Sequence, residues 1–281
     1  MKPNFLIVGA ARSGTTSLFQ YLDPHPEIYM SQVKELNFFS NERFWSRGID
    51  WYEQRFAGAP AGVKAIGEAS TSYTKAPFTT DVAQRIHDYN PGMKLVYIVR
   101  DPIARYISHY MQRIQVGLET RPFSQTLENL EQEACAWQGR YAYQIKQYLR
   151  FFPETQLLIR SIDQIRDEPA QVIRDIYRFL DVDESFEVRG LQKIHNANTR
   201  VVRKSRLGGQ LLRAYRRYLE HRDIPFAVKK LVLSTSDLGG KVVTTPVPTE
   251  AERAKLIAFF AEDTRELHDR FQVPTEGWLS A

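Results

Sequence analysis

The stretch FLIVGAARSGTTSL, at residues 5–18, constrains the fold of this chain more than any other segment. Its apolar start at residues 5–8 is typical of a buried strand, and the Gly-rich turn after it leads directly into a helical pattern. A strand, a Gly-rich turn and a helix N-terminus in this order are the elements of a phosphate-binding loop. In open parallel sheets, ligands bind at the carboxyl ends of the strands. The sequence therefore predicts an α/β fold with an anion site close to the N-terminus.

Short β-rich segments alternate with helical patterns over the first two thirds of the chain. We expect strands at residues 5–8, 64–67, 95–99 and 156–160. We expect helices at residues 13–22, 79–89, 103–116, 139–151 and 169–180. This alternation predicts a P-loop-type three-layer fold, in which helices flank a central parallel sheet.

The remainder of the chain adds one clear helix start. Thr249 and Glu252 form a capping box, which predicts a C-terminal helix that runs to Phe271. No repeat, low-complexity segment or linker interrupts the sequence, so we expect a single domain over residues 1–281.

Composition excludes several classes of protein. With 43% hydrophobic and 25% charged residues, the chain fits no disordered class. The first apolar run is interrupted by Arg12, too early for a signal peptide, and no run approaches the roughly 18 apolar residues of a membrane span. We therefore expect no transmembrane segment and a cytoplasmic location. Cys135 is the single cysteine, which excludes an internal disulfide and favours a buried small hydrophobic side chain.

The loop itself is rich in small donors but lacks a lysine. Gly9 and Gly14 permit backbone shapes that a Cβ would block, so the amides of residues 13–17 can converge on one anion. The nucleotide-triphosphate loop has Lys after its last glycine, where this chain has Thr15. Arg12 is the one cation inside the loop.

A second anion site is predicted after the strand at residues 95–99. That strand ends in Arg100, where Mg²⁺ chemistry would favour an Asp, and Ser108 lies two helical turns further on. Arg100 and Ser108 are therefore expected to share one phosphate. Two separated anion sites without a metal site describe a nucleotide that carries phosphates at both its 5′ and its 3′ end.

Basic residues gather late in the chain. Residues 189–230 hold twelve Lys and Arg against two acidic residues, Glu220 and Asp223, so this segment carries +10 and the rest of the chain −5. The segment either forms a solvated helix face or faces an anion, such as an acidic glycan or a membrane surface. The sequence leaves these alternatives open.

Several blocks together resemble one family. GAARSGTTSL and YIVRDPIARYISHY resemble the 5′-phosphosulfate loop and the 3′-phosphate segment of sulfotransferases that use 3′-phosphoadenosine 5′-phosphosulfate (PAPS). DPHPEIYMSQVKELNFF resembles the segment that carries the catalytic Glu in members that modify glycans, and GEASTSY matches a further block. The resemblance is closest to the N- and 3-O-sulfotransferase domains that act on heparan-type glycans and to their bacterial relatives. The blocks occur in order from residue 5 to about residue 183.

The resemblance implies an activity and a set of site residues. The activity is sulfuryl transfer from PAPS to a hydroxyl or amine of a small-molecule or glycan acceptor, with adenosine 3′,5′-bisphosphate as the product. Glu35 matches the general base, and Arg12 stands where many members have a lysine against the oxygen that bridges phosphate and sulfate. The implied donor contacts are Arg12, Ser13, Gly14, Thr15, Thr16, Ser17, Arg100, Ser108, Lys204 and Arg206. The candidate acceptor contacts are Lys34, Tyr73 and His195.

Alternatives remain at this point. His25, His109 and His195 are rival candidates for the base, Glu35 can instead simply pair with a nearby cation, and Tyr73 fits core packing equally well. A P-loop small-molecule kinase that uses Mg-ATP is the second hypothesis for the whole chain. A non-enzymatic polyanion binder is the third, although no nucleic-acid motif occurs and we expect no nucleic-acid partner.

Overall fold

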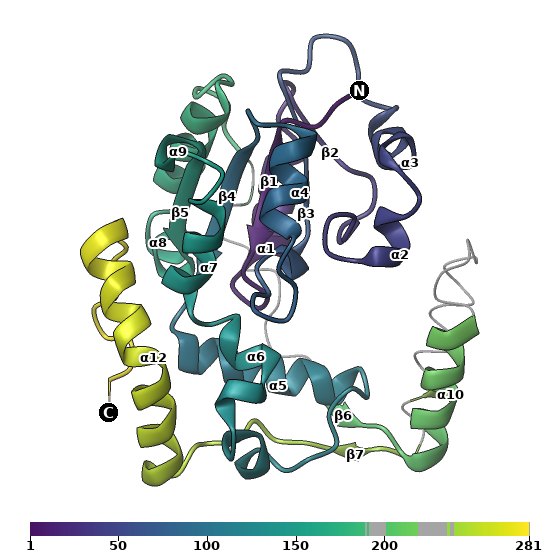
Figure 1. Ribbon diagram of the computed structural model, residues 1–281, viewed down its shortest axis with the longest axis vertical. Coiled ribbons are helices and arrows are strands. Elements are labelled where there is room, and N and C mark those ends of the chain that lie inside the picture. The colour runs from purple at the N-terminus through teal and green to yellow at the C-terminus, as the bar shows by residue number, and fades with distance from the viewer. Residues whose placement is uncertain (189, 191–200, 219–234, 237–238, 281) are drawn as a thin grey trace.

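The computed structural model describes residues 1–188, 190, 201–218, 235–236 and 239–280. At its centre lies a five-stranded sheet of order β2-β3-β1-β4-β5, in which every neighbouring pair is parallel (Figure 1). The strands are β1 (Phe5–Gly9), β2 (Ile28–Met30), β3 (Ala65–Ala69), β4 (Lys94–Val99) and β5 (Leu157–Ser161). Helices cover both faces of this sheet, which confirms the predicted three-layer fold.

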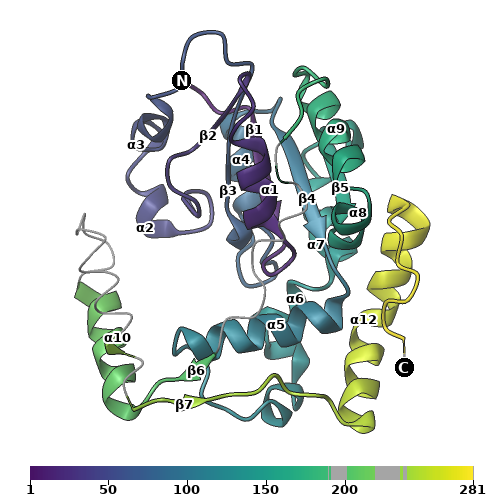
Figure 2. The same ribbon diagram turned by 180° about the vertical axis from the view of Figure 1, so that it is seen from behind.

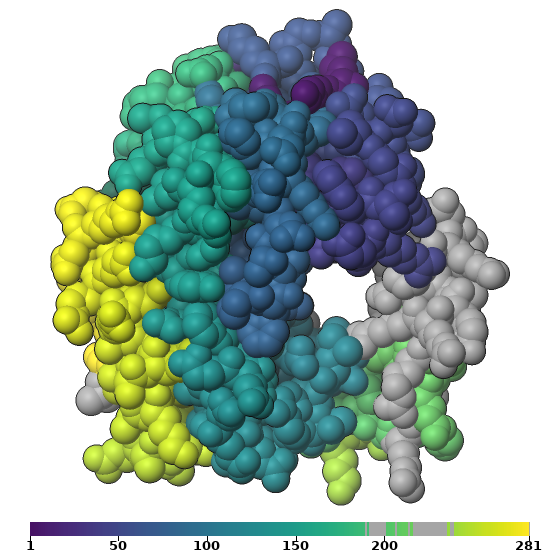
Figure 3. Space-filling model, in the orientation of Figure 1, coloured from purple at the N-terminus to yellow at the C-terminus, as the bar shows by residue number. Residues whose placement is uncertain are grey.

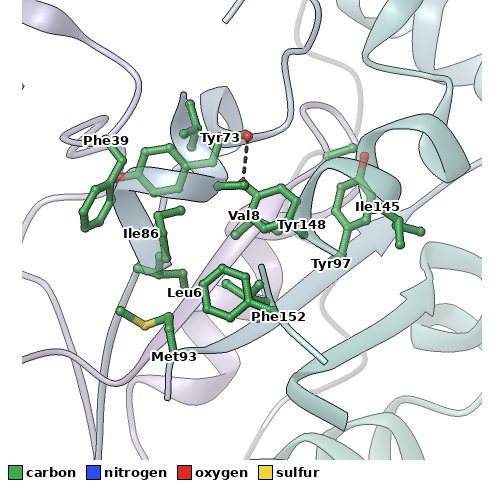
Figure 4. Close-up of a cluster of buried hydrophobic side chains, with 14 of the residues drawn as sticks. Leu6, Val8, Phe39, Tyr73, Ile86, Met93, Tyr97, Ile145, Tyr148 and Phe152 are labelled. Atoms are coloured by element: carbon green, nitrogen blue, oxygen red, sulfur yellow. Dashed lines mark hydrogen bonds between the residues drawn. The ribbon is translucent and has the colours of Figure 1, made fainter. Parts of the chain in front are cut away.

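Successive side chains of β1 point to opposite faces of the sheet, and each face is covered by a layer of helices. Leu6 and Val8 point to one face, where they pack with α4 (Val82–Tyr89) and α7 (Tyr141–Tyr148) in a fully buried cluster (Figure 4). Burial of so much apolar surface is the main force that holds this layer on the sheet.

The alternate side chains of β1 point to the opposite face of the sheet. Phe5 and Ile7 pack against Leu18 of α1 (Thr15–Leu22) and against the buried side of α9 (Pro169–Leu180). Figure 2 shows α1 lying in front of the sheet on this side.

The C-terminal helix α12 (Glu250–Phe271) is part of the same packed body. Leu256 and Phe260 pack in a cluster with α5 (Pro102–Gln115), whereas Leu267 belongs to the cluster around α7. In Figure 3 its yellow surface lies directly against the teal surface of the middle of the chain.

The remaining elements complete the described structure. They are α2 (Glu42–Trp45), α3 (Ile49–Glu53), α6 (Ala134–Trp137), α8 (Ile162–Asp167), α10 (Arg206–Tyr218), β6 (Val202–Arg203) and β7 (Lys241–Val242), with the 3₁₀ turns η1 (Gln54–Phe56), η2 (Thr71–Tyr73), η3 (Ser124–Leu127), η4 (Leu130–Gln132) and η5 (Glu154–Gln156). The strands β6 and β7 pair antiparallel, apart from the main sheet.

The predicted elements match the structure with small corrections. The four predicted strands are present with ends shifted by at most two residues, and the capping box at Thr249 starts α12 as predicted. The three-residue strand β2 was not predicted, and the helices predicted at residues 79–89 and 139–151 are both shorter in the structure. Cys135 is buried, as expected. None of the helices in the described part of the chain has the length and apolarity needed to cross a membrane.

Candidate active site

A cavity of about 840 Å³ lies where the five strands end. Each strand of the sheet leads into a segment that contributes to its wall. The contributing residues include Arg12 after β1, Glu35 after β2, Thr71 after β3, Arg100 after β4 and Asp163 after β5. The predicted position of the site, at the carboxyl edge of a parallel sheet, is therefore confirmed.

The loop after β1 directs a helix N-terminus into this cavity. Gly14 caps α1 with φ +89, a left-handed conformation that suits glycine, and an added Cβ would lie 3.1 Å from Ile162 Cδ1. In the first turn of α1 the backbone N–H groups of Thr15 and Thr16 have no acceptor within the helix, and both residues line the cavity. Ser17 lines it as well. These donors and the positive end of the helix suit an anion.

Ser13 differs from its prediction. It is fully buried, does not line the cavity, and its amide donates to the carbonyl oxygen of Ala10 at 3.2 Å. Ser13 therefore closes the turn beneath the cavity, and the expectation that it contacts the donor is not met by its position.

Arg12, Arg100 and Ser108 all line the cavity, whereas the spacing predicted only that Arg100 and Ser108 share one anion, with Arg12 in a separate site. Arg12 Nε donates to Ser108 Oγ at 3.0 Å, and an Arg100 guanidinium N–H donates to the carbonyl oxygen of Arg12 at 3.3 Å. Partial burial, and then the charge of Arg100, lower the pKa of the Arg12 guanidinium. Within the described residues neither arginine is paired with a carboxylate, so two neighbouring cations face the same cavity.

Three groups hold the carboxylate of Glu35 in the wall of the cavity. Lys34 Nζ donates to Glu35 Oε1 at 2.7 Å, and the Thr71 amide donates to Oε2 at 2.9 Å. The Thr71 hydroxyl lies 3.2 Å from Oε2. Lys34 Nζ also lies 3.4 Å from Thr15 Oγ1, which connects this carboxylate to the loop after β1. The side chain of Glu35 remains 35% exposed toward the cavity, so a substrate can reach it.

Tyr73 is a core residue, and the prediction that it lines the acceptor pocket is wrong. Its side chain is 2% exposed, and its hydroxyl donates to Glu68 Oε1 at 2.5 Å. Its carbonyl oxygen accepts a hydrogen bond of 2.8 Å from the Tyr148 hydroxyl, the dashed line in Figure 4. The 3₁₀ turn η2 points Tyr73 into the sheet-side cluster while it points Thr71 into the cavity.

The rival histidines are placed in different surroundings. His25 packs against Tyr177 and Phe186, and its Nε2 lies 2.9 Å from the carbonyl oxygen of Asp183, as befits a turn residue. Burial, and then the charge of Arg105, lower the pKa of His109 well below its usual value. Neither histidine lines the cavity.

The late basic segment is described only in part. His195 lies outside the described residues, and so does the side chain of Arg206. Lys204 is half-buried and does not line the cavity in the described structure, although Val201, three residues earlier, does.

Sequence reasoning missed several polar residues of the wall, among them Thr71, Asp163 and Arg166. Thr71 holds the Glu35 carboxylate, and Asp163 pairs with Arg166 at 2.9 Å at the end of β5. The block GEASTSY contained the signal for Thr71, because hydroxyl residues directly after a buried strand lie at the ligand-binding edge.

Comparison with known proteins agrees with this arrangement. The sequence profile described as "Sulfotransferase domain" matches residues 2–206. The human bifunctional heparan sulfate N-deacetylase/N-sulfotransferase 3 is 30% identical over 199 residues, which are 64% of this chain and 22% of that protein. The human heparan sulfate glucosamine 3-O-sulfotransferase 6 is 30% identical over 184 residues, which are 63% of this chain and 52% of that protein. The chain thus spans about half the length of the 3-O-sulfotransferase and less than a quarter of the length of the bifunctional relative.

Solved structures extend the likeness to the whole chain. A sulfotransferase from Alicyclobacillus acidocaldarius superposes with a TM-score of 0.69 at 28% identity, and the match covers 100% of both chains. The sulfotransferase domain from the curacin biosynthetic pathway shares the fold, with a TM-score of 0.51 at 16% identity over 93% of this chain and 98% of that chain. Because the matching profile covers most of the sequence, including every strand of the central sheet, the chain belongs to the sulfotransferase domain family.

Proposed function

We propose that this protein transfers a sulfuryl group from PAPS to a hydroxyl or amine of an acceptor and releases adenosine 3′,5′-bisphosphate. The observation that carries the proposal is the pair of guanidinium groups, Arg12 and Arg100, that share one cavity with a helix N-terminus. Neighbouring cations without a carboxylate partner are stabilised by a bound anion. A ligand with two phosphate-type groups suits two cations at the ends of two adjacent strands.

The described residues fit the donor in two groups. Arg12 and the first-turn amides of Thr15 and Thr16 would hold the 5′ end, where the anion meets the helix N-terminus. Arg100 and Ser108 would hold the 3′-phosphate. Lys204 and Arg206 are proposed to approach the same phosphate from the late basic segment, on the strength of the resemblance of that segment alone.

The chemistry proposed for the chain is proton removal and charge stabilisation. PAPS, when bound, supplies the activated sulfuryl group. Glu35 would accept the proton of the acceptor hydroxyl or amine, since it lines the cavity and its partner Lys34 lies 3.4 Å from Thr15 of the loop. Arg12 and the helix amides would stabilise negative charge that develops on the leaving phosphate. Lys34 would hold the carboxylate of Glu35 beside the loop after β1, because its Nζ bonds both Glu35 and Thr15.

A carbohydrate is the acceptor that we propose. The curated relatives named above are heparan sulfate sulfotransferases, and the wall near Glu35 offers hydroxyl and charged groups that suit a polar acceptor. Lys34 and His195 are the proposed acceptor contacts. We also infer that residues 1–281 act as one domain, since α12 packs on both α5 and α7.

A kinase that uses Mg-ATP is less well supported. Thr15 follows Gly14 in place of the phosphate-binding lysine, and Arg100 precedes Asp101 at the end of β4. Asp101 accepts hydrogen bonds from the Ile103 and Ala104 amides, so it caps α5.

Isothermal titration of the purified protein tests the proposal. We expect adenosine 3′,5′-bisphosphate to bind without added metal, and Arg100→Ala to weaken that binding by about tenfold or more while binding of adenosine 5′-phosphate changes little, since one lost charged hydrogen bond costs about 1.5–3 kcal/mol. Equal losses for both nucleotides would contradict the assignment of Arg100 to the 3′-phosphate. Binding of Mg-ATP in preference to the bisphosphate would contradict the proposed activity.

A further inference from the structure

A second carboxylate, that of Glu68, lies in the strand that leads to Thr71 and takes part in no step of the proposed chemistry. Glu68, in β3, is 0% exposed and does not line the cavity. Its Oε2 accepts a hydrogen bond of 2.7 Å from the Ser70 hydroxyl, and its Oε1 accepts one of 2.5 Å from the Tyr73 hydroxyl. Burial of a carboxylate is costly, and hydrogen bonds such as these two offset part of that cost.

One of these two bonds continues toward Glu35. While the Ser70 hydroxyl donates to Glu68, its oxygen accepts the backbone N–H of Asn37 at 2.8 Å. The side-chain amide of Asn37 in turn donates to the carbonyl oxygen of Glu35 at 2.8 Å. Because a hydroxyl has a single hydrogen, its commitment to Glu68 leaves the lone pairs of Ser70 directed at Asn37.

The segment held in this way has an unfavourable backbone. Glu35 has φ +66 and Asn37 has φ +53, and neither is a glycine. Left-handed conformations of such residues cost free energy and persist only where the surroundings impose them. The amide of Glu35 is fixed to β3 through the carbonyl oxygen of Ala69 at 3.0 Å. Asn37 is fixed in turn by its N–H, which donates to Ser70 Oγ, and by its Oδ1, which accepts from Ser72 Oγ.

We propose that Glu68 is a positioning residue, which orients the Ser70 hydroxyl so that it holds Asn37 and thereby fixes the direction of the Glu35 carboxylate. Glu68 acts through hydrogen-bond geometry and touches no substrate. Its kinetic consequence rests on the proposed function, whereas its effect on the Asn37 amide does not.

Tyr73 supplies a matched control. Its hydroxyl bonds the same carboxylate as Ser70 but leads into the core, where Tyr73 packs among apolar residues of the α4 and α7 layer. Tyr73→Phe therefore removes one hydrogen bond to Glu68 and leaves the connection to Asn37 intact. Ser70→Ala removes the other bond and breaks that connection.

Two variants of Glu68 distinguish the effect of its hydrogen-bond acceptors from the effect of its charge. Glu68→Met nearly preserves the buried volume and removes both acceptor oxygens. Glu68→Gln removes the charge but keeps one oxygen that can accept from Ser70, so it serves as the conservative rescue.

The experiment measures kcat with PAPS and a glycan acceptor, the Kd for adenosine 3′,5′-bisphosphate, and hydrogen exchange of the Asn37 amide. We expect Ser70→Ala and Glu68→Met to lower kcat by about 10- to 100-fold, the size of effect that a misplaced catalytic group produces. Their bisphosphate Kd should stay within about twofold, because the donor contacts are untouched. Exchange of the Asn37 amide should accelerate at least about tenfold in both variants, since its acceptor is lost or disoriented.

The controls decide between positioning and general destabilisation. We expect Glu68→Gln and Tyr73→Phe to keep kcat within about threefold of the unaltered protein, and Ser70→Ala to add nothing further in a Glu68→Met background. A loss in Tyr73→Phe equal to that in Ser70→Ala would overturn the proposal, as would unchanged exchange of Asn37 in Ser70→Ala and Glu68→Met. If the unaltered protein transfers no sulfuryl group but Asn37 exchange responds as expected, the proposed function fails and the role of Glu68 in holding the turn stands.

Discussion

Arg12 is the residue in which this site departs most clearly from a lysine-containing phosphate loop. It has φ +71, which places its side chain across the cavity toward α5, where Nε donates to Ser108. A guanidinium presents several donors in a planar fork, whereas an ammonium is a compact point charge. Arg12 can therefore bond Ser108 and a bound anion at the same time.

This arrangement predicts a graded effect of substitution. Arg12→Ala should lower kcat by about 10²- to 10³-fold, the loss typical for removal of one donor to a developing negative charge. Arg12→Lys should recover part of that loss, because it restores the charge without the bond to Ser108. Steady-state kinetics with PAPS provide the measurement, and Arg174→Ala, an exposed arginine of α9, is the control. Turnover that is unchanged in Arg12→Ala would remove Arg12 from the chemistry.

The wall residues on which the proposed chemistry rests could be predicted from the sequence, because motif and spacing determine them. Arg12, Arg100, Ser108 and Glu35 all line the one cavity. Tyr73 was assigned wrongly, since the sequence does not tell which side chain of a short 3₁₀ turn points inward. The left-handed turn at Glu35 was equally inaccessible, because it depends on hydrogen bonds from residues about 35 positions later in the chain.

Among the helices and strands, those with a strong local sequence pattern were predicted closely, and those without one were not. β1, β4 and α12 were predicted closely, because apolar runs and a capping box specify them locally. β2 has three residues and forms by pairing with β3, a partner more than thirty positions away. α7 begins at Tyr141, after the predicted residue 139, and a tertiary contact lies at this N-terminus.

That contact is a cap supplied by another helix. Asp263 of α12 accepts hydrogen bonds from the amides of Ala142 and Tyr143, at 3.0 and 2.8 Å, at the N-terminus of α7. Asp263→Ala leaves these buried donors without partners, and we expect the free energy of unfolding to fall by about 1–3 kcal/mol. Urea denaturation provides the measurement, with the exposed neighbour Glu262→Ala as the control. Equal stabilities of the two variants would show that α12 does not cap α7 in solution.

For the molecule as a whole, the parallel topology brings the site residues together at the carboxyl edge of the sheet. All five strands end at the cavity, so residues from positions 12 to 163 meet there although they are far apart in the sequence. Polar groups near this edge are partly enclosed by the layers of the fold, and Glu68 is enclosed completely. Because this buried carboxyl group has a raised pKa, its protonation makes the stability of the whole protein depend on pH.

Burial raises the pKa of Glu68 from 4.5 to about 7, against the opposing effect of the hydrogen bonds from Ser70 and Tyr73. The folded protein therefore binds more protons than the unfolded chain between about pH 4.5 and pH 7. By linkage, the contribution of Glu68 to the free energy of unfolding falls as the pH rises through this window, by about 3 kcal/mol in total. Asp263, whose pKa burial raises to about 6, acts in the same direction at lower pH.

Glu68→Gln isolates this effect, because glutamine does not titrate. We expect the stability of the unaltered protein, measured by urea denaturation, to decrease relative to that of Glu68→Gln as the pH is raised from 5 to 8. Carboxylates with lowered pKa do not obscure the difference, since they are present in both proteins and titrate below pH 4.5. At Glu119, burial raises the pKa, but the hydrogen bonds from Arg121 and Thr120 and the charge of Arg121 together bring it to about 2. Parallel stability curves for the two proteins between pH 5 and 8 would mean that Glu68 is ionised throughout, and that the fold tolerates a charge at the centre of the layer that supports Glu35.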